Sequence, residues 1–212
     1  TLDLGGVNRR IIVDSVITNP NRNDAVIETV IQNGGIIKSG SRALYLTNVN
    51  TYSGPTNIQQ GTVVINSAQS IGDGSATNSI ILANGSTLRS TGANVDLGVN
   101  RTLTLSGVTG GTLEVTGTNK LTASGPIVGD DCMQLTKAGT GALILTNDAN
   151  SYAGGTLVSA GTLDVSNTTG SGTGTGALTV AAGATLSGSG VISPNDGKNI
   201  VVNGTLSPGV LG

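Results

Sequence analysis

The sequence predicts an all-β protein in which residues 1–212 form a single parallel β-solenoid. Three observations predict this fold: short strand-like segments recur along the chain, aromatic residues are scarce, and one long unit occurs twice. The chain contains no Trp, Phe or His, and it contains 3 Tyr. Because aromatic side chains normally supply much of the buried area of a core, Val, Ile, Leu and Ala must here fill a thin, layered interior.

The recurring segments are built around Gly-x-Thr-Leu and alternate aliphatic with small polar side chains, which is the pattern of a strand with one buried face. A β-sandwich pairs strands of differing character, usually around large aromatics, whereas a solenoid stacks like residues on like in successive coils. About 20–25 residues per coil and about 4.8 Å per rung predict a rod on the order of 45 Å long. The stretch 24–32 (DAVIETVIQ) fits a helix or a strand. The strand-like segments are 61–65, 85–90, 100–105, 111–115, 161–165, 183–188 and 204–208.

The long unit occupies about residues 2–92 and again 95–190, followed by a tail at 191–212. Lys38 recurs 99 residues later as Lys137, and the turn NTYSG (50–54) recurs as NSYAG (150–154). Upstream, LDLGGVNRRIIV (2–13) matches VDLGVNRTLTL (95–105). The chain is therefore predicted to contain two copies of one structural unit.

The copied turn is either a ligand site presented twice or a repeated piece of scaffold. A ligand platform needs converging polar or aromatic partners, which the chain lacks, so we favour the scaffold. Asn50 and Asn150 are expected to bond the turn backbone, Gly54 and Gly154 to adopt conformations closed to other residues, and both tyrosines to cover aliphatic side chains at a coil corner. The predicted motif residues are Asn50, Tyr52, Gly54, Thr56, Gly61, Thr62, Asn150, Tyr152, Gly154, Thr156, Gly161 and Thr162.

Residues 137–166 (KAGTGALILTNDANSYAGGTLVSAGTLDVS) closely resemble the autotransporter-associated β-strand repeat, also called the passenger-associated transport repeat. Residues 38–66 are a weaker copy, which departs from the pattern at Arg42, Pro55 and Val63. The segment NGTLSPG (203–209) resembles the one that commonly closes such regions. The resemblance implies a right-handed parallel β-helix that serves as an extracellular structural shaft in a bacterial autotransporter passenger or adhesin. It implies no particular receptor.

The sequence offers little for catalysis, so we expect no enzyme, catalytic residue, cofactor or metal. Without His, a Ser or Cys nucleophile lacks its usual base. Asp130 and Asp131 are the one adjacent acidic pair, and a solvated loop is favoured over the paired carboxylates of a carbohydrate-cleaving β-helix. Cys132 and Met133 are expected to fill the core. The segments GDG (72–74), GSGTGTG (170–176) and PNDGKN (194–199) are expected to be turns or corners.

The expected function is a non-enzymatic shaft on the bacterial surface or in the extracellular space, with an unidentified host or cell-surface ligand as partner. A net charge of −2 gives no footprint for nucleic acid, and no apolar run is long enough to enter a membrane. Because the chain opens on Thr1, it is expected to be a mature piece or a fragment. Alternatives are a fibre subunit that self-associates through its solenoid ends, a carbohydrate-binding β-helix, and an ice-binding protein using the threonines of 102–125.

Overall fold

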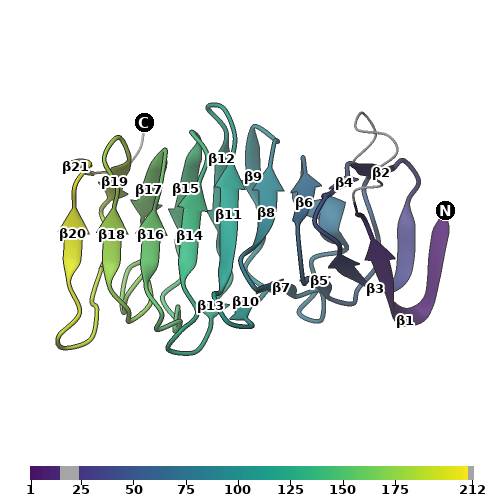
Figure 1. The fold of residues 1–212 in the computed structure, drawn as a ribbon, viewed down its shortest axis with the longest axis horizontal. Helices are drawn as coiled ribbons and strands as arrows, with labels where there is room; N and C mark the ends of the chain where they lie inside the picture. Colours follow the sequence, from purple (N-terminus) through teal and green to yellow (C-terminus); the bar gives the residue numbers. More distant parts are fainter. Residues whose placement is uncertain (15–23, 210–212) are drawn as a thin grey trace.

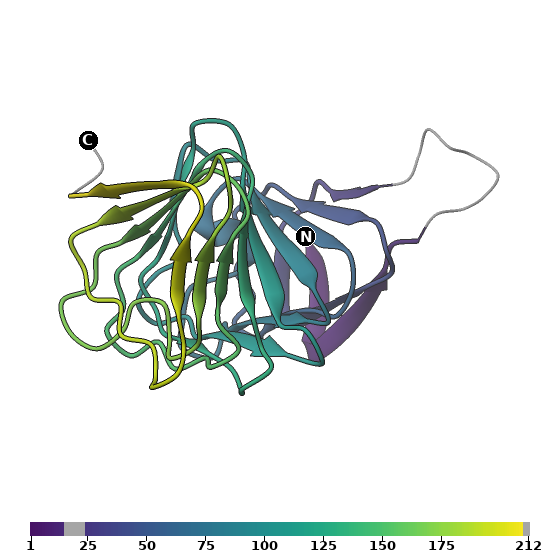
Figure 2. The same cartoon turned by 60° about the vertical axis from the view of Figure 1, so that its left-hand side comes forward.

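The computed structural model describes residues 1–14 and 24–209 of the 212-residue chain. It is a rod of stacked coils that runs from the N-terminus at one end towards the C-terminus at the other (Figure 1). Figure 2 shows the strands of successive coils stacked one behind another. Every pairing between two named strands is parallel. The predicted all-β class and the parallel β-solenoid are confirmed.

Three sheets form the sides of the rod. Sheet A contains β1 (Leu2–Ile12), β3 (Ile31–Ser39), β5 (Thr56–Ile58), β7 (Ile80–Ala83), β10 (Leu103–Ser106) and β13 (Ile127–Val128). Sheet B contains β2 (Ala25–Ile27), β4 (Ala43–Leu46), β6 (Thr62–Ile65), β8 (Ser86–Ser90), β11 (Gly111–Val115), β14 (Leu135–Ala138), β16 (Thr156–Val158), β18 (Leu178–Val180) and β20 (Ile200–Val202). Sheet C contains β9 (Asn94–Asp96), β12 (Lys120–Ala123), β15 (Ala142–Leu145), β17 (Thr162–Val165), β19 (Thr185–Gly188) and β21 (Thr205–Pro208).

The core is built from aliphatic ladders that run along the rod. In sheet B, Leu44, Val63, Leu88 and Leu113 pair in succession through β4, β6, β8 and β11, and all four are fully buried. Each such side chain, removed from water, contributes about 1.5–3 kcal/mol. Because a side chain in a strand alternates between the two faces, residues one position away point outward. The alternation read from the sequence thus decides which face each strand buries.

The segment 24–32 forms strands. Its residues enter β2 and the beginning of β3, so the β-branched side chains decide the choice that the sequence left open. The one helical turn in the described residues is the 3-10 helix η1 (Ala68–Ile71). Over the same residues, no helix has the length and apolarity needed to cross a membrane.

Residues 38–66 and their copy, residues 137–166, lie on different sides of the rod. Lys38 belongs to β3 in sheet A, whereas its counterpart Lys137 belongs to β14 in sheet B. Four steps along sheet A lead from β3 through β5, β7 and β10 to β13, and β14 follows β13 on the next side. Likewise β4 and β6 lie in sheet B, and their counterparts β15 and β17 lie in sheet C. The second segment therefore lies four coils and one further side along the rod, whereas β1 and β10, which contain matching upstream residues, both lie in sheet A.

The side of the rod that lacks strands also differs between the two segments. After β4 and again after β6, the chain crosses the side that sheet C occupies from β9 onward, by way of residues 47–55 and 66–79. After β15 and β17, it crosses the side of sheet A by way of residues 146–155 and 166–177. The two copies of the Asn-x-Tyr-x-Gly turn thus face different directions.

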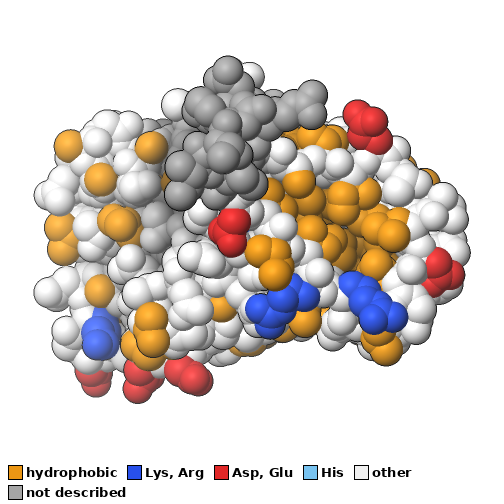
Figure 3. Space-filling model, turned by 45° about the vertical axis from the view of Figure 1, so that its right-hand side comes forward, with side chains coloured by type: hydrophobic (Ala, Val, Ile, Leu, Met, Phe, Trp, Pro, Cys, Tyr) orange, Lys and Arg blue, Asp and Glu red, His pale blue; other side chains and the backbone are white. Residues whose placement is uncertain are grey.

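Among residues 1–14 and 24–209, each end of the rod carries strands with one unpaired edge. β1 and β2 end their sheets near the N-terminus, and β20 and β21 end theirs near the C-terminus. Large exposed hydrophobic side chains gather in these end strands, and Figure 3 shows such side chains grouped at the N-terminal end of the rod. They are Leu2, Val7, Ile12 and Val26 at one end and Ile200, Val201 and Leu206 at the other.

Candidate functional site

The tyrosines of the copied turn are the first candidates for a binding site, and both are completely buried. Tyr52 and Tyr152 have no exposed surface and belong to the hydrophobic core. Each phenol shares a hydrogen bond of 2.7 Å with a buried threonine, Thr56 or Thr156. Burial raises the pKa of both phenols above the ordinary value, because the phenolate would lose its hydration. Neither ring offers a surface to a ligand.

The asparagines of the turn join three successive coils. The side-chain oxygen of Asn50 accepts from the Ile31 amide at 2.8 Å, and its nitrogen donates to the Ser70 carbonyl at 2.6 Å. Asn150 repeats this with Ile127 and Gly172, both at 2.8 Å, and its weaker bond to the Asn147 carbonyl stays within the turn. The predicted bond to the turn backbone is present at Asn150, but the shorter bonds of both side chains go to other coils. They satisfy backbone groups of the coils on either side.

The glycines of the turn are required for a reason that the sequence did not indicate. A Cβ on Gly54 would lie 2.5 Å from the Gly34 carbonyl oxygen of the preceding coil, and one on Gly154 would lie 2.5 Å from the Met133 backbone. Neither Gly54 nor Gly154 has a positive φ, so the predicted special conformation is wrong and close packing takes its place.

The second pair of motif glycines does adopt the left-handed conformation. Gly61 has φ 72° and Gly161 has φ 67°. Each precedes a half-buried threonine, Thr62 or Thr162, that begins β6 or β17. These glycines turn the chain from one side of the rod to the next.

Two buried lysines were missed as functional candidates, although the sequence paired them. Lys38 and Lys137 have no exposed surface, and each ammonium donates to three backbone carbonyls. The partners of Lys38 are the carbonyls of Ser39, Gly40 and Gln60, at 2.7–3.1 Å. Those of Lys137 are the carbonyls of Ala138, Gly139 and Ala160, at 2.8–3.0 Å. In each case one carbonyl belongs to the next coil. Strand alternation was the available signal, because it puts Lys137 on the same face as the buried Leu135.

The buried lysines and tyrosines predict a stability maximum at alkaline pH. Burial lowers the pKa of Lys137 to about 8, so between about pH 8 and 10 the unfolded chain binds more protons and stability rises with pH. Burial raises the pKa of Tyr52 and Tyr152, so above about pH 10 the folded chain holds more protons and stability falls. Thermal unfolding between pH 7 and 11 measures both the rise and the fall in stability. Lys137→Met should flatten the rise, and Tyr152→Phe should weaken the fall; an unchanged profile in both variants would contradict this account.

A row of threonines runs along the outer surface of sheet B. Thr62, Thr87, Thr112 and Thr136 pair in register through four coils, a regularity that the drifting sequence spacing concealed. The neighbouring rank, two residues further along each strand, contains Val64, Arg89, Glu114 and Ala138. Arg89 and Glu114 form an ion pair of 2.8 Å in that rank. The neighbouring rank contains no threonine in any of these four coils. The surface therefore does not present two adjacent ranks of threonines.

The acidic pair lies in the loop between β13 and β14. Asp130 and Asp131 are exposed. Cys132 is also exposed, so its predicted place in the core is wrong, whereas Met133 is 4% exposed and does fill the core. Because sheet A ends at β13, the chain here leaves the regular strand stack, and the cysteine falls on the outside of the loop.

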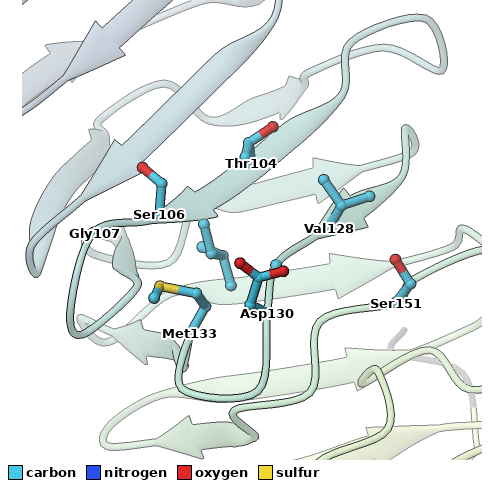
Figure 4. A pocket seen from close by; sticks show the side chains of 9 residues that line it. Thr104, Ser106, Gly107, Val128, Asp130, Met133 and Ser151 are labelled. Carbon is cyan, nitrogen blue, oxygen red and sulfur yellow. The ribbon is translucent and has the colours of Figure 1, made fainter.

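A shallow hollow of about 490 Å³ adjoins this loop. Figure 4 shows Asp130 and Met133 side by side in it, with Ser106 and Thr104 on the neighbouring strand β10 and Ser151 to one side. Its polar groups are one carboxylate and these three hydroxyls. Within residues 1–14 and 24–209, no group of three His, Cys, Asp or Glu residues could hold a metal ion.

The sequence model of the passenger-associated-transport-repeat family matches residues 36–65 and 135–165. The chain carries two passenger-associated transport repeats. The resemblance indicated by the sequence is thereby confirmed. The matched residues form the last part of β3 and all of β4–β6 in the first repeat, and β14–β17 in the second. Each repeat therefore contains one buried lysine and one Asn-x-Tyr-x-Gly turn.

The chain is also similar to the "Adhesin BmaC autotransporter" of Brucella suis biovar 1 (strain 1330). The two are 36% identical over 151 residues, which is 65% of this chain. The chain spans 4% of the length of that relative. No solved structure matches this chain.

Proposed function

We propose that this chain is a non-enzymatic structural shaft from the passenger of a bacterial adhesin-type autotransporter, secreted or exposed on the cell surface. The similarity to an autotransporter adhesin and the two passenger-associated transport repeats support this setting. The observation that carries the shaft function is the use of the repeat's distinctive side chains. Lysine, asparagine and tyrosine all point inward and bond neighbouring coils or core hydroxyls.

The shaft works by satisfying backbone groups from coil to coil. Parallel pairing supplies bonds along three sides, and the buried asparagines and lysines supply them where the chain turns between sides. Each coil adds about 4.8 Å of length, so the nine strands of sheet B span roughly 40 Å.

Binding measurements on the isolated chain test the shaft proposal. The chain, immobilised on a surface, should bind neither host cells nor a glycan panel above the level of an unrelated protein. The proposal would be contradicted if the chain bound a ligand and if Asp130→Ala or Thr112→Lys removed that binding without changing the unfolding midpoint. Both side chains point outward and make no hydrogen bond to a neighbouring coil among the described residues. The destabilised Tyr152→Ala variant controls for loss of binding through unfolding.

A second candidate function is assembly into a fibre by end-to-end stacking. The unpaired edges of β1, β2, β20 and β21, with their exposed hydrophobic side chains, favour it because such edges can continue a sheet into another molecule. Sedimentation and electron microscopy at rising concentration would decide. A chain that stays monomeric at millimolar concentration is not a fibre subunit.

A further inference from the structure

The chain builds the same corner twice, once at the N-terminal end of the rod and once in its middle. At the end, the Gly5 amide donates to Asp3 at 2.8 Å, and Arg9 Nε donates to the Leu4 carbonyl at 3.0 Å. In the middle, the Gly98 amide donates to Asp96 at 2.9 Å, and Arg101 Nη1 donates to the Leu97 carbonyl at 2.7 Å. Both corners therefore fold an arginine back over an Asp-Leu-Gly turn.

In the middle corner, the arginine also donates hydrogen bonds to the preceding coil. Arg101 Nε donates to the side-chain oxygen of Asn78 at 2.8 Å, and Nη2 donates to the Gly72 carbonyl at 2.9 Å. Asn78 is itself fully buried and donates to the Gly54 carbonyl, one coil further back. With these partners Arg101 is 3% exposed. The guanidinium thus locks β10 onto the coil that contains β7.

In the end corner, the two terminal guanidinium nitrogens of Arg9, Nη1 and Nη2, bond none of the described residues. Arg9 is exposed, and its one hydrogen bond to the described residues is that to Leu4. β1 is the last strand of sheet A, so its outer edge has no partner strand among those residues. Leu2, Val7 and Ile12 lie exposed along it, at 39%, 49% and 64%. The N-terminal end of the rod therefore exposes the edge of β1, its apolar side chains and the guanidinium of Arg9 on one surface.

We infer that the outer edge of β1, together with Arg9, is a docking surface for one further parallel β-coil of the kind that residues 67–93 form. Such a coil would add strands beside β1 and β2 and offer Arg9 a backbone carbonyl and a carboxamide oxygen at one corner. The chain itself shows this occupant against the matching corner at Arg101. Arginine suits the task because its planar guanidinium presents its donors in a rigid fork, whereas a lysine ammonium is a compact point charge on a flexible stem. The inference rests on the fold and does not depend on the shaft function.

The experiment places a second copy of residues 67–93 directly before Thr1, which reproduces the order of segments found before Asn94. Arg9→Ala and Arg9→Lys are made in the original and the extended chain, with Arg10→Ala, an exposed neighbour, as the matched control. Thermal unfolding and backbone hydrogen exchange are measured on all of them.

In the extended chain, β1 amides should exchange at least about tenfold more slowly than in the original, because their edge is now paired. Arg9→Ala should lower the unfolding midpoint of the extended chain and leave that of the original unchanged; Arg9→Lys should follow it, and Arg10→Ala should act equally in both. An added coil without protection, or an Arg9→Ala effect of equal size in both chains, overturns the inference. Concentration-dependent oligomers of the original chain that Arg9→Ala abolishes also overturn it, and assign the surface to a second copy.

Discussion

Replacing Tyr152 with alanine should lower the free energy of unfolding by about 3–5 kcal/mol, the usual cost of removing a buried aromatic side chain. The ring has no exposed surface and belongs to the core, and in a core this narrow few neighbours can move to fill the cavity. Tyr52→Ala should act similarly. Chemical denaturation of the purified variants measures both effects.

Two controls separate the ring from its hydroxyl and from tyrosine in general. Tyr152→Phe should cost about 1 kcal/mol, because it removes only the hydrogen bond to Thr156. Tyr45→Ala should cost less than about 1 kcal/mol, since Tyr45 lies half-buried on the outer face of β4. If Tyr152→Ala abolished binding to some ligand at unchanged stability, the scaffold interpretation of the turn would be wrong.

Replacing Lys137 with methionine should lower the free energy of unfolding by about 2–4 kcal/mol. Methionine retains an apolar stem of similar length but gives no donor to the carbonyls of Ala138, Gly139 and Ala160. Against this loss stands the desolvation of the ammonium, which is also what lowers its pKa. The substitution is still destabilising because it leaves three carbonyls without a donor, and each unmade hydrogen bond of a buried group costs about 1–3 kcal/mol.

Lys198→Met is the matched control. Lys198 is exposed in the corner before β20, so the same substitution there should change stability by less than about 0.5 kcal/mol. Equal costs at Lys137 and Lys198 would show that the buried ammonium contributes nothing. Urea titrations at pH 7 keep the Lys137 ammonium charged, since burial lowers its pKa to about 8.

The solenoid could be predicted because its information is local and repeated. Alternation within segments such as GTVVI (61–65) and GTLEV (111–115) identifies strands, and their recurrence identifies stacking. The tyrosine turn could be predicted as scaffold for the same reason: an aromatic copied into an otherwise aromatic-poor chain marks a register position.

The partners of the buried polar groups could not be predicted, because they depend on the register between coils. Asn50 bonds residues 19 and 20 positions away, and no local pattern specifies which backbone groups will face it. Gly54 looked like a conformational requirement, but its neighbour is a carbonyl of the preceding coil. The surroundings of Lys137 could not be predicted, because a lysine in a strand normally faces water and the three carbonyls that accept from it converge only when the coils stack.

The sideways step between the two repeats determines how an array of such units would meet its surroundings. Because the second repeat lies one side further round a three-sided rod, further copies with the same step would point their loops to the third side and then to the first, so that only every third copy would repeat an orientation. A partner approaching from one direction therefore meets a given epitope at one-third of its full density. Copying this unit spreads its loops as a spiral around the surface.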